Sequence, residues 1–140
     1  MLSTWPEITQ AIVRYPVRTI EAQAISFDWP EQGPATAIFQ IVCAELGGRE
    51  RIVIGVNVLP EAQASSTSAL RMNSELSIGA FSAFKGNIVL KHIMTLGRFD
   101  EEELHEVVRT MASTVAKAQE RLRKQGPSQQ HSPSPVADRC

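Results

Sequence analysis

The stretch LRMNSELSIGAFSAFKGNIVLKHIMTL, residues 70–96, is typical of a helix end that runs into a two-stranded hairpin. Apolar residues weight both arms of the hairpin, and the chain turns at residues 85–87, Lys-Gly-Asn. No catalytic group stands among these residues with an obvious partner. The pattern therefore indicates strand pairing and core packing rather than chemistry.

A further strand is expected near the start of the chain, in the stretch VRTIEAQAISFDW, residues 17–29. Ile25, Phe27 and Trp29 alternate there with polar Ser26 and Asp28, which is the period of a half-buried strand. The PEQGP stretch that follows holds two prolines and a glycine, so we expect a turn.

Two more strands, residues 35–46 and 50–60, flank Gly47-Gly48. Glycine adopts the positive φ that a tight hairpin turn wants, so these strands should pair directly. Pro60 ends the second strand. Alternation places one set of its apolar residues on a single face: Ile52, Ile54, Val56 and Val58.

Two short helices are expected at residues 3–15 and within residues 61–76. A serine or threonine can cap the first, and Pro16 stops it because proline lacks the backbone N–H that a helix needs. The serine and threonine cluster at residues 65–67 can cap the second.

The longest helix is expected from Asp100, which is an N-cap candidate followed by three glutamates. Gly126-Pro127 should stop it. Its apolar positions are spaced by threes and fours: Leu104, Val108, Met111, Val115, Ala118 and Leu122. Such a stripe can be a coiled-coil seam, but in a chain of this size it more often covers the protein's own sheet.

This order of elements predicts an α+β domain. We expect an antiparallel β-sheet of about five strands packed against N-terminal, middle and long C-terminal helices. The domain should cover residues 1–125. Residues 126–140 hold too few large apolar groups to fold and should form a disordered tail.

The composition narrows the classes of partner. Its 14 basic and 15 acidic residues give a net charge of −1, which argues against nucleic acid and anionic membranes. No apolar stretch reaches the roughly 20 residues of a membrane span, and the first residues lack the features of a signal peptide. With only two cysteines and no disulfide framework, we expect a cytoplasmic protein.

Few residues are candidates for chemistry. The histidines His92, His105 and His131 lie far apart without the spacing of a metal site, so we expect no metal and no cofactor. Cys43 sits in an apolar run, where a small buried hydrophobe is the simpler interpretation than a nucleophile. Asn73 must find hydrogen-bond partners, by capping a helix end, bonding the adjacent strand or binding a ligand. We therefore expect no enzyme.

Several of these segments carry a family resemblance, strongest over residues 70–122. The matching features are Leu70 before Asn73, Gly79-Ala80-Phe81, the Gly86 to Leu90 pattern, a long helix from Asp100, and the Ile54 to Pro60 strand. In these the chain resembles the YbjN family, which shares its fold with the type III secretion chaperones. The resemblance spans about residues 4–125 and rests on hydrophobic patterns.

The resemblance implies a compact α+β fold, frequent dimers and no catalytic activity. Family members are described as sensory transduction regulators, or as chaperones that hold partner polypeptides in extended form. Secretion chaperones proper are distinctly acidic, whereas this chain is nearly neutral, which argues against an effector-chaperone role in a secretion system.

The main hypothesis is a non-catalytic protein-interaction module, chaperone-like or regulatory, that binds a protein or peptide partner and forms a homodimer. Extended peptides can pair with a sheet edge or pack on a sheet face. The residues expected to contact the partner are Ile38, Phe39, Ile41, Ile54, Val56 and Val58. Those expected at the dimer interface are Ile88, Leu90 and His92. Each of these side chains can equally belong to the core.

The alternative hypothesis is a small-molecule-binding domain or an enzyme. Its pocket would lie between the sheet and the long C-terminal helix and would contain Cys43, His92 or Asn73. This hypothesis predicts a deep cavity where polar groups converge. The main hypothesis predicts a shallow apolar patch or a dimer interface.

Overall fold

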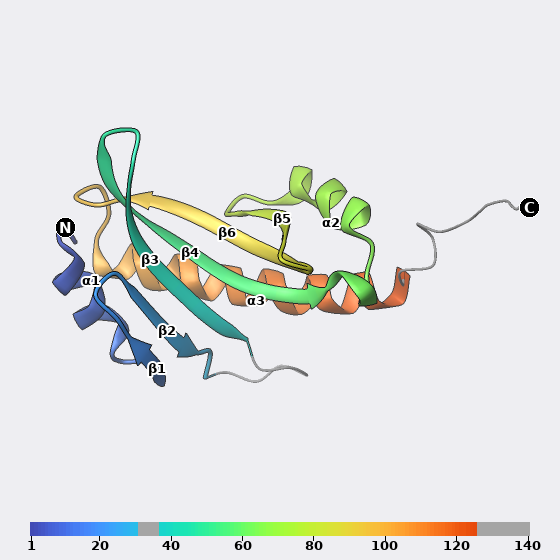
Figure 1. Cartoon of the computed structure of the whole chain (residues 1–140), viewed down its shortest axis with the longest axis horizontal. Coiled ribbons are helices and arrows are strands. Elements are labelled where there is room, and N and C mark those ends of the chain that lie inside the picture. Colours follow the sequence, from blue (N-terminus) through green and yellow to red (C-terminus); the bar gives the residue numbers. More distant parts are fainter. Residues whose placement is uncertain (31–36, 126–140) are drawn as a thin grey trace, which may run out of the picture.

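The computed structural model describes residues 1–30 and 37–125 and shows a six-stranded sheet with three α-helices (Figure 1). Short 3-10 turns at Glu61–Gln63 and Asn73–Glu75 flank the middle helix. The predicted α+β class is confirmed. In chain order the elements are α1 (Trp5–Ile12), β1 (Val17–Ile20), β2 (Ala24–Asp28), β3 (Ile38–Leu46), β4 (Arg49–Pro60), α2 (Ser66–Met72), β5 (Ala80–Phe84), β6 (Asn87–Thr95) and α3 (Glu101–Gln125).

The sheet has six strands rather than about five because residues 17–29 fold into a hairpin, β1 and β2. The backbone N–H of Glu21 donates to the carbonyl of Ala24 at 2.7 Å and closes the turn. β1 is one of the two edge strands of the sheet, β5 being the other, and most of the side chains of β1 are exposed. It therefore lacks the apolar alternation that marks β2 in the sequence.

All strand pairs are antiparallel, and the strand order is β1-β2-β3-β4-β6-β5. The β3–β4 hairpin turns at Gly47 and Gly48, with φ of +63° and +76°, as predicted. The β5–β6 hairpin turns at Lys85 and Gly86, with φ of +50° and +80°. β4 pairs with β3 on one side and β6 on the other, so it is the centre of the sheet.

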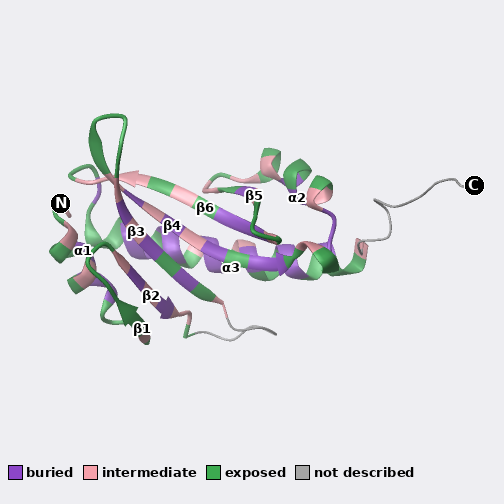
Figure 2. Ribbon diagram, in the orientation of Figure 1, coloured by how far each residue is buried: buried purple, intermediate pink, exposed green. Residues whose placement is uncertain are grey.

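The helices pack on one face of this sheet, and α3 runs behind the central strands in the view of Figure 1. Ile8 and Ile12 of α1 and Met72 of α2 join the α3 side chains in a single core cluster. The six apolar positions of the α3 stripe are at most 2% exposed, so the stripe is core and not a seam with a second chain. Figure 2 shows this buried layer in purple. Within the described residues, no helix is long and apolar enough to cross a membrane.

The predicted helix starts are confirmed by their caps. The side chain of Thr4 accepts the N–H of Glu7, and the Oγ of Ser65 accepts the N–H of Ser68 at 3.1 Å. The carboxylate of Asp100 accepts the N–H of Glu103 at 2.8 Å. The turn expected after Pro30, the stop at residues 126–127 and the tail of residues 126–140 lie outside the described residues.

Asn73 ties the end of α2 to β5. Its Oδ1 accepts the N–H of Phe81 at 2.6 Å, and its Nδ2 donates to the carbonyl of Phe81 at 3.1 Å. The amide thus satisfies both backbone groups of one residue on the outermost strand, as a neighbouring strand would. Of the roles left open for Asn73, the structure shows two: it is the C-cap residue of α2, and its side chain bonds the adjacent strand.

Gly79, just before β5, has a conformation and surroundings that exclude a side chain. Its φ is +80°, and an added Cβ would lie 3.0 Å from the carbonyl oxygen of Lys91 and 3.1 Å from Cδ1 of Leu90. Gly86 has the same φ, but no atom lies within 4 Å of its added Cβ.

These two glycines give a matched pair of variants. Gly86→Ala should lower the free energy of unfolding by about 1 kcal/mol, the backbone cost of alanine at positive φ. Gly79→Ala should cost about 1–3 kcal/mol more, because the clash with β6 is added. Urea unfolding followed by circular dichroism measures both. Equal losses in the two variants would show that the contact with β6 does not constrain Gly79.

Candidate functional site

The face of the sheet opposite the helices is not covered by any described element (Figure 1). Side chains alternate along a strand, so the residues between core positions point to this face. The register aligns them in rows across β3, β4 and β6, namely Gln40–Gly55–Lys91 and Val42–Val53–Ile93. We call this surface the open face and define it by Ser26, Ile38, Gln40, Val42, Val53, Gly55, Asn57, Phe84, Lys91 and Ile93.

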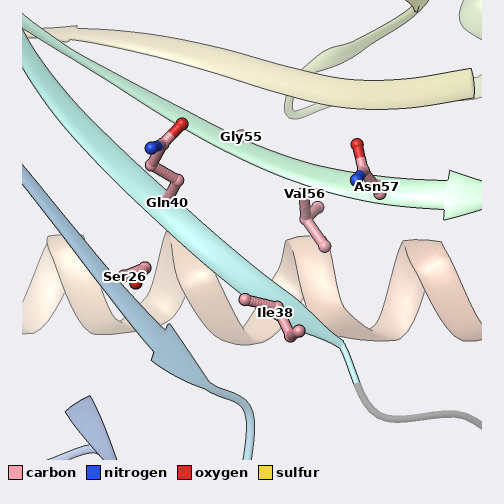
Figure 3. A pocket seen from close by; sticks show the side chains of 6 residues that line it. All are labelled: Ser26, Ile38, Gln40, Gly55, Val56 and Asn57. Atoms are coloured by element: carbon pink, nitrogen blue, oxygen red, sulfur yellow. The ribbon is translucent and has the colours of Figure 1, made fainter. Parts of the chain in front are cut away.

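Gly55 leaves a hollow in the middle of the open face. A depression of about 340 Å³ lies here, and Figure 3 shows the amides of Gln40 and Asn57 on either side of the glycine. An added Cβ would fit, because its nearest neighbour would be Cγ of Lys91 at 3.9 Å. The glycine therefore keeps the face hollow without being required by packing.

Apolar side chains lie beside this hollow. A second depression, of about 500 Å³, is lined by Val42, Val53, Val89 and Phe84 together with polar neighbours. The Nζ of Lys91 lies 4.6 Å from the centroid of the Phe84 ring, a cation–π contact. Three large apolar side chains of the open face are about half exposed: Ile38 (45%), Phe84 (50%) and Ile93 (51%). The face is thus partly apolar, with amides and a lysine among the apolar groups.

Five of the six residues expected to contact a partner point away from the open face. Phe39, Ile41, Ile54, Val56 and Val58 are at most 4% exposed and belong to the core, which is the other role that their pattern allowed. Ile38 alone of the six is exposed. On β4 the expected residues form the more apolar of its two faces, which is the face that the helices cover, whereas on β3 they belong to both faces. On the open face, β4 contributes Val53, Gly55 and Asn57 instead.

The residues expected at a dimer interface also face the helices. Ile88 and Leu90 are fully buried in the core. His92 is half-buried, and its Nδ1 accepts the N–H of Gly79 at 3.1 Å. These side chains pack and bond within the chain and do not form an exposed patch.

The residues of the alternative pocket do not converge. Cys43 is aligned with Ile52 and Met94, whereas His92 is aligned with Ile54, and Asn73 is engaged with β5. Burial raises the pKa of the Cys43 thiol, and Glu50 adds to this, so the protonated form is favoured. Core side chains of both layers pack in the space between the sheet and α3. Over residues 1–30 and 37–125, no three histidine, cysteine or acidic residues gather as metal ligands.

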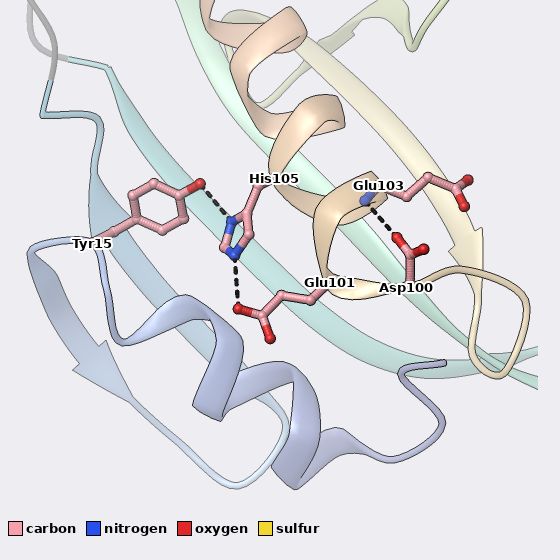
Figure 4. A network of polar contacts seen from close by, with 5 residues as sticks. All are labelled: Tyr15, Asp100, Glu101, Glu103 and His105. Atoms are coloured by element: carbon pink, nitrogen blue, oxygen red, sulfur yellow. Dashed lines mark hydrogen bonds and ion pairs between the residues drawn. The ribbon is translucent and has the colours of Figure 1, made fainter.

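A polar chain that is buried except at Glu101, and that the sequence did not reveal, joins the start of α3 to the segment after α1 (Figure 4). His105 is 4% exposed. Its Nε2 lies 3.3 Å from a carboxylate oxygen of Glu101, and its Nδ1 lies 2.7 Å from the Tyr15 hydroxyl. Because a carboxylate only accepts, Nε2 carries the proton and the tyrosine hydroxyl donates to Nδ1. The i, i+4 spacing of Glu101 and His105 was a visible signal, but nothing in the sequence linked them to Tyr15.

Burial lowers the pKa of His105, and the nearby Arg14 and Arg109 lower it further, against the opposing effect of Glu101. Burial also lowers the pKa of His92. Each folded-state pKa therefore lies below its unfolded value near 6.5. Between the two values the unfolded chain binds more protons than the folded chain.

Stability should therefore rise as the pH increases toward about 7 and then level off, because the two histidines remain neutral in the folded state while those of the unfolded chain lose their protons. His105→Gln and His92→Gln should each reduce this rise, and the double variant should remove most of it. Urea unfolding at half-unit pH intervals measures the slope. A flat wild-type profile, or the wild-type slope in the double variant, would contradict this assignment.

No protein-family model matches the chain, and no curated protein is significantly similar to it. The likeness to the YbjN family therefore rests on the residue patterns alone. Any function has to be argued from the geometry of the chain itself.

Proposed function

We propose that this chain is a non-catalytic protein-interaction module of the cytoplasm, chaperone-like or regulatory, that binds a partner polypeptide on its open face. The observation that carries the proposal is the one-sided packing of the sheet. The helices bury one face, while Ile38, Phe84 and Ile93 remain about half exposed on the other. Antiparallel sheets with one solvated face usually carry polar residues there, so exposed large apolar groups favour an interaction surface.

The size of the open face suits a polypeptide. The six strands are 4 to 12 residues long, and at a rise of about 3.3 Å per residue and a spacing of about 4.8 Å between strands one face of the sheet measures about 700 Å². That area is close to the roughly 800 Å² that each partner contributes to a standard protein interface. The amides beside Gly55 can bond an extended backbone, and the neighbouring valines can pack against its side chains.

The non-catalytic part of the proposal is supported by what the reactive groups do. The pKa of Cys43 is raised, which favours the unreactive thiol. His92 accepts a backbone N–H, and Asn73 bonds both backbone groups of Phe81. His92 and Asn73 thus have structural roles, and Cys43 is favoured as the thiol.

The open face can be tested with an unfolded client. Reduced insulin, whose B chain aggregates, should stay dispersed in the presence of the wild-type protein, as measured by light scattering. Phe84→Asp/Ile93→Asp should abolish this protection, because a charge on an apolar patch opposes the burial of apolar client side chains. Both residues are about half exposed, so the variant should still fold.

Leu70→Asp/Val13→Asp is the matched control, because these side chains are 51% and 50% exposed but lie on α2 and at the end of α1. It should protect insulin as the wild type does. Aggregation that is unaffected by the wild-type protein, or protection that survives in the open-face variant, would refute the proposal.

Homodimer formation also belongs to the proposal: two open faces would cover each other until a client takes the place of the second copy. A dimer would have about twice the chain mass of 15.4 kDa. Light scattering at two well-separated concentrations should give this mass for the wild type and the monomer mass for Phe84→Asp/Ile93→Asp. A monomer mass for the wild type at both concentrations would remove dimer formation from the proposal and leave client binding to be judged by the insulin assay.

A further inference from the structure

The outer edge of β6 is only half paired. β5 pairs with β6 from Asn87 to Lys91, whereas His92 to Thr95 pair with β4 alone. Figure 1 shows β5 beside only the first part of β6. In the described parts of the chain, no strand lies along the other side of these last four residues. We call this segment the free edge.

Next to the free edge, two side chains bond backbone groups of β5 and of the residue before it. Asn73 bonds both backbone groups of Phe81 on the outer strand, and His92 accepts the N–H of Gly79. Unpaired strand edges offer a row of backbone donors and acceptors to another chain. The free edge is thus a place where a further strand can add in line with β5.

Three arginines lie near the free edge, two of them on β4, on the other side of β6, and one in the turn before α3. A depression of about 510 Å³ beside it is lined by Arg49, Arg51 and Arg98, with Glu103 as the acidic residue of the lining. Burial lowers the pKa of His92, which also lines it, so this histidine is neutral at pH 7. The lining therefore carries a net positive charge, although the whole chain is slightly negative.

Two of the guanidinium groups are available to a ligand. Arg51 donates to the carbonyl of Leu46 and to Oγ1 of Thr95, at 3.0 Å and 3.2 Å, which fixes it beside the free edge. The side chains of Arg49 and Arg98 are exposed and make no hydrogen bond or ion pair with any described residue. Guanidinium groups bind carboxylates through paired hydrogen bonds.

We propose that the free edge binds an extended acidic segment of a partner polypeptide, which adds to the sheet as a strand beside β6. The backbone of the segment pairs with His92 to Met94, because the carbonyl of Thr95 already accepts the N–H of Arg98 at 3.2 Å, and its carboxylates meet Arg49, Arg51 and Arg98. The proposal goes beyond the proposed function, since it adds a second binding site with its own partner chemistry.

The geometry also predicts the pattern of the segment. Side chains of an added strand alternate between the two faces of the sheet. Those on one side meet Arg51 and Thr95, and those on the other meet Met94 and Phe99. Alternating acidic and apolar residues therefore fit best. A second copy of this chain fits poorly, because pairing two free edges would bring two sets of arginines together.

Fluorescein-labelled peptides test this. The probe is VEVEVEVE, with VKVKVKVK as the charge control and VEPEVEPE as a control of equal charge that cannot form a strand. Anisotropy at low salt should show binding of VEVEVEVE alone. Arg49→Glu/Arg98→Glu should weaken it by roughly tenfold or more, because two attractive charges become repulsive.

Arg71→Glu/Arg123→Glu makes the same charge change on exposed arginines of α2 and α3 without described ion pairs and should leave binding within about twofold. Equal weakening in both double variants would overturn the proposal, as it would show attraction by overall charge. Equal binding of VEPEVEPE, or competition by millimolar sodium phosphate, would also overturn it, since an anion site without strand addition would remain.

The insulin assay separates this proposal from the proposed function. If insulin protection is lost in Phe84→Asp/Ile93→Asp while VEVEVEVE does not bind the wild type, the free-edge proposal fails and the open-face proposal stands. If VEVEVEVE binds as expected while insulin is not protected, the free edge is an acidic-peptide site and the open face is not a client surface.

Discussion

The packing of α3 against the central strands is the interaction on which the rest of the structure depends. β4 supplies one row of side chains to this contact, and its neighbours β3 and β6 extend the row on either side. A buried hydrogen bond from Nε2 of Gln119 to the carbonyl of Val58, at 2.9 Å, fixes the helix along the strand. Because α3, together with α1 and α2, covers one face of the sheet, the opposite face is left for other uses.

The elements of this fold were largely visible in the sequence. Alternation along β4, glycines in the hairpin turns, capping residues and the α3 stripe each act through near neighbours in the chain, so they can be read locally. β1 was not predicted as a separate strand, because a strand whose side chains are mostly exposed shows no alternation of apolar and polar residues. The accessible face was harder to predict, since alternation defines two faces and only tertiary packing decides which one the helices cover.

Sequence reasoning was weakest where residues distant in the chain meet. Tyr15 and His105 are 90 positions apart and share a hydrogen bond, and Asn73 bonds Phe81, which lies eight positions later in the chain. The arginines near the free edge come from the start of β4 and the turn before α3, so no run of basic residues in the sequence indicates them. Gly55 was the one local sign of the open face, as a missing side chain in an otherwise regular strand.

The position of α3 at the end of the described chain has a consequence for synthesis on the ribosome. The six strands are complete once Thr95 has been made, but the helix that shields their apolar side comes last. Until about Leu122 has emerged from the ribosome, α3 cannot yet cover the apolar face of the sheet. Such intermediates are prone to aggregate, and translation adds only about 5–20 residues per second. The newly made protein thus passes, for a second or more, through a state in which it needs protection itself.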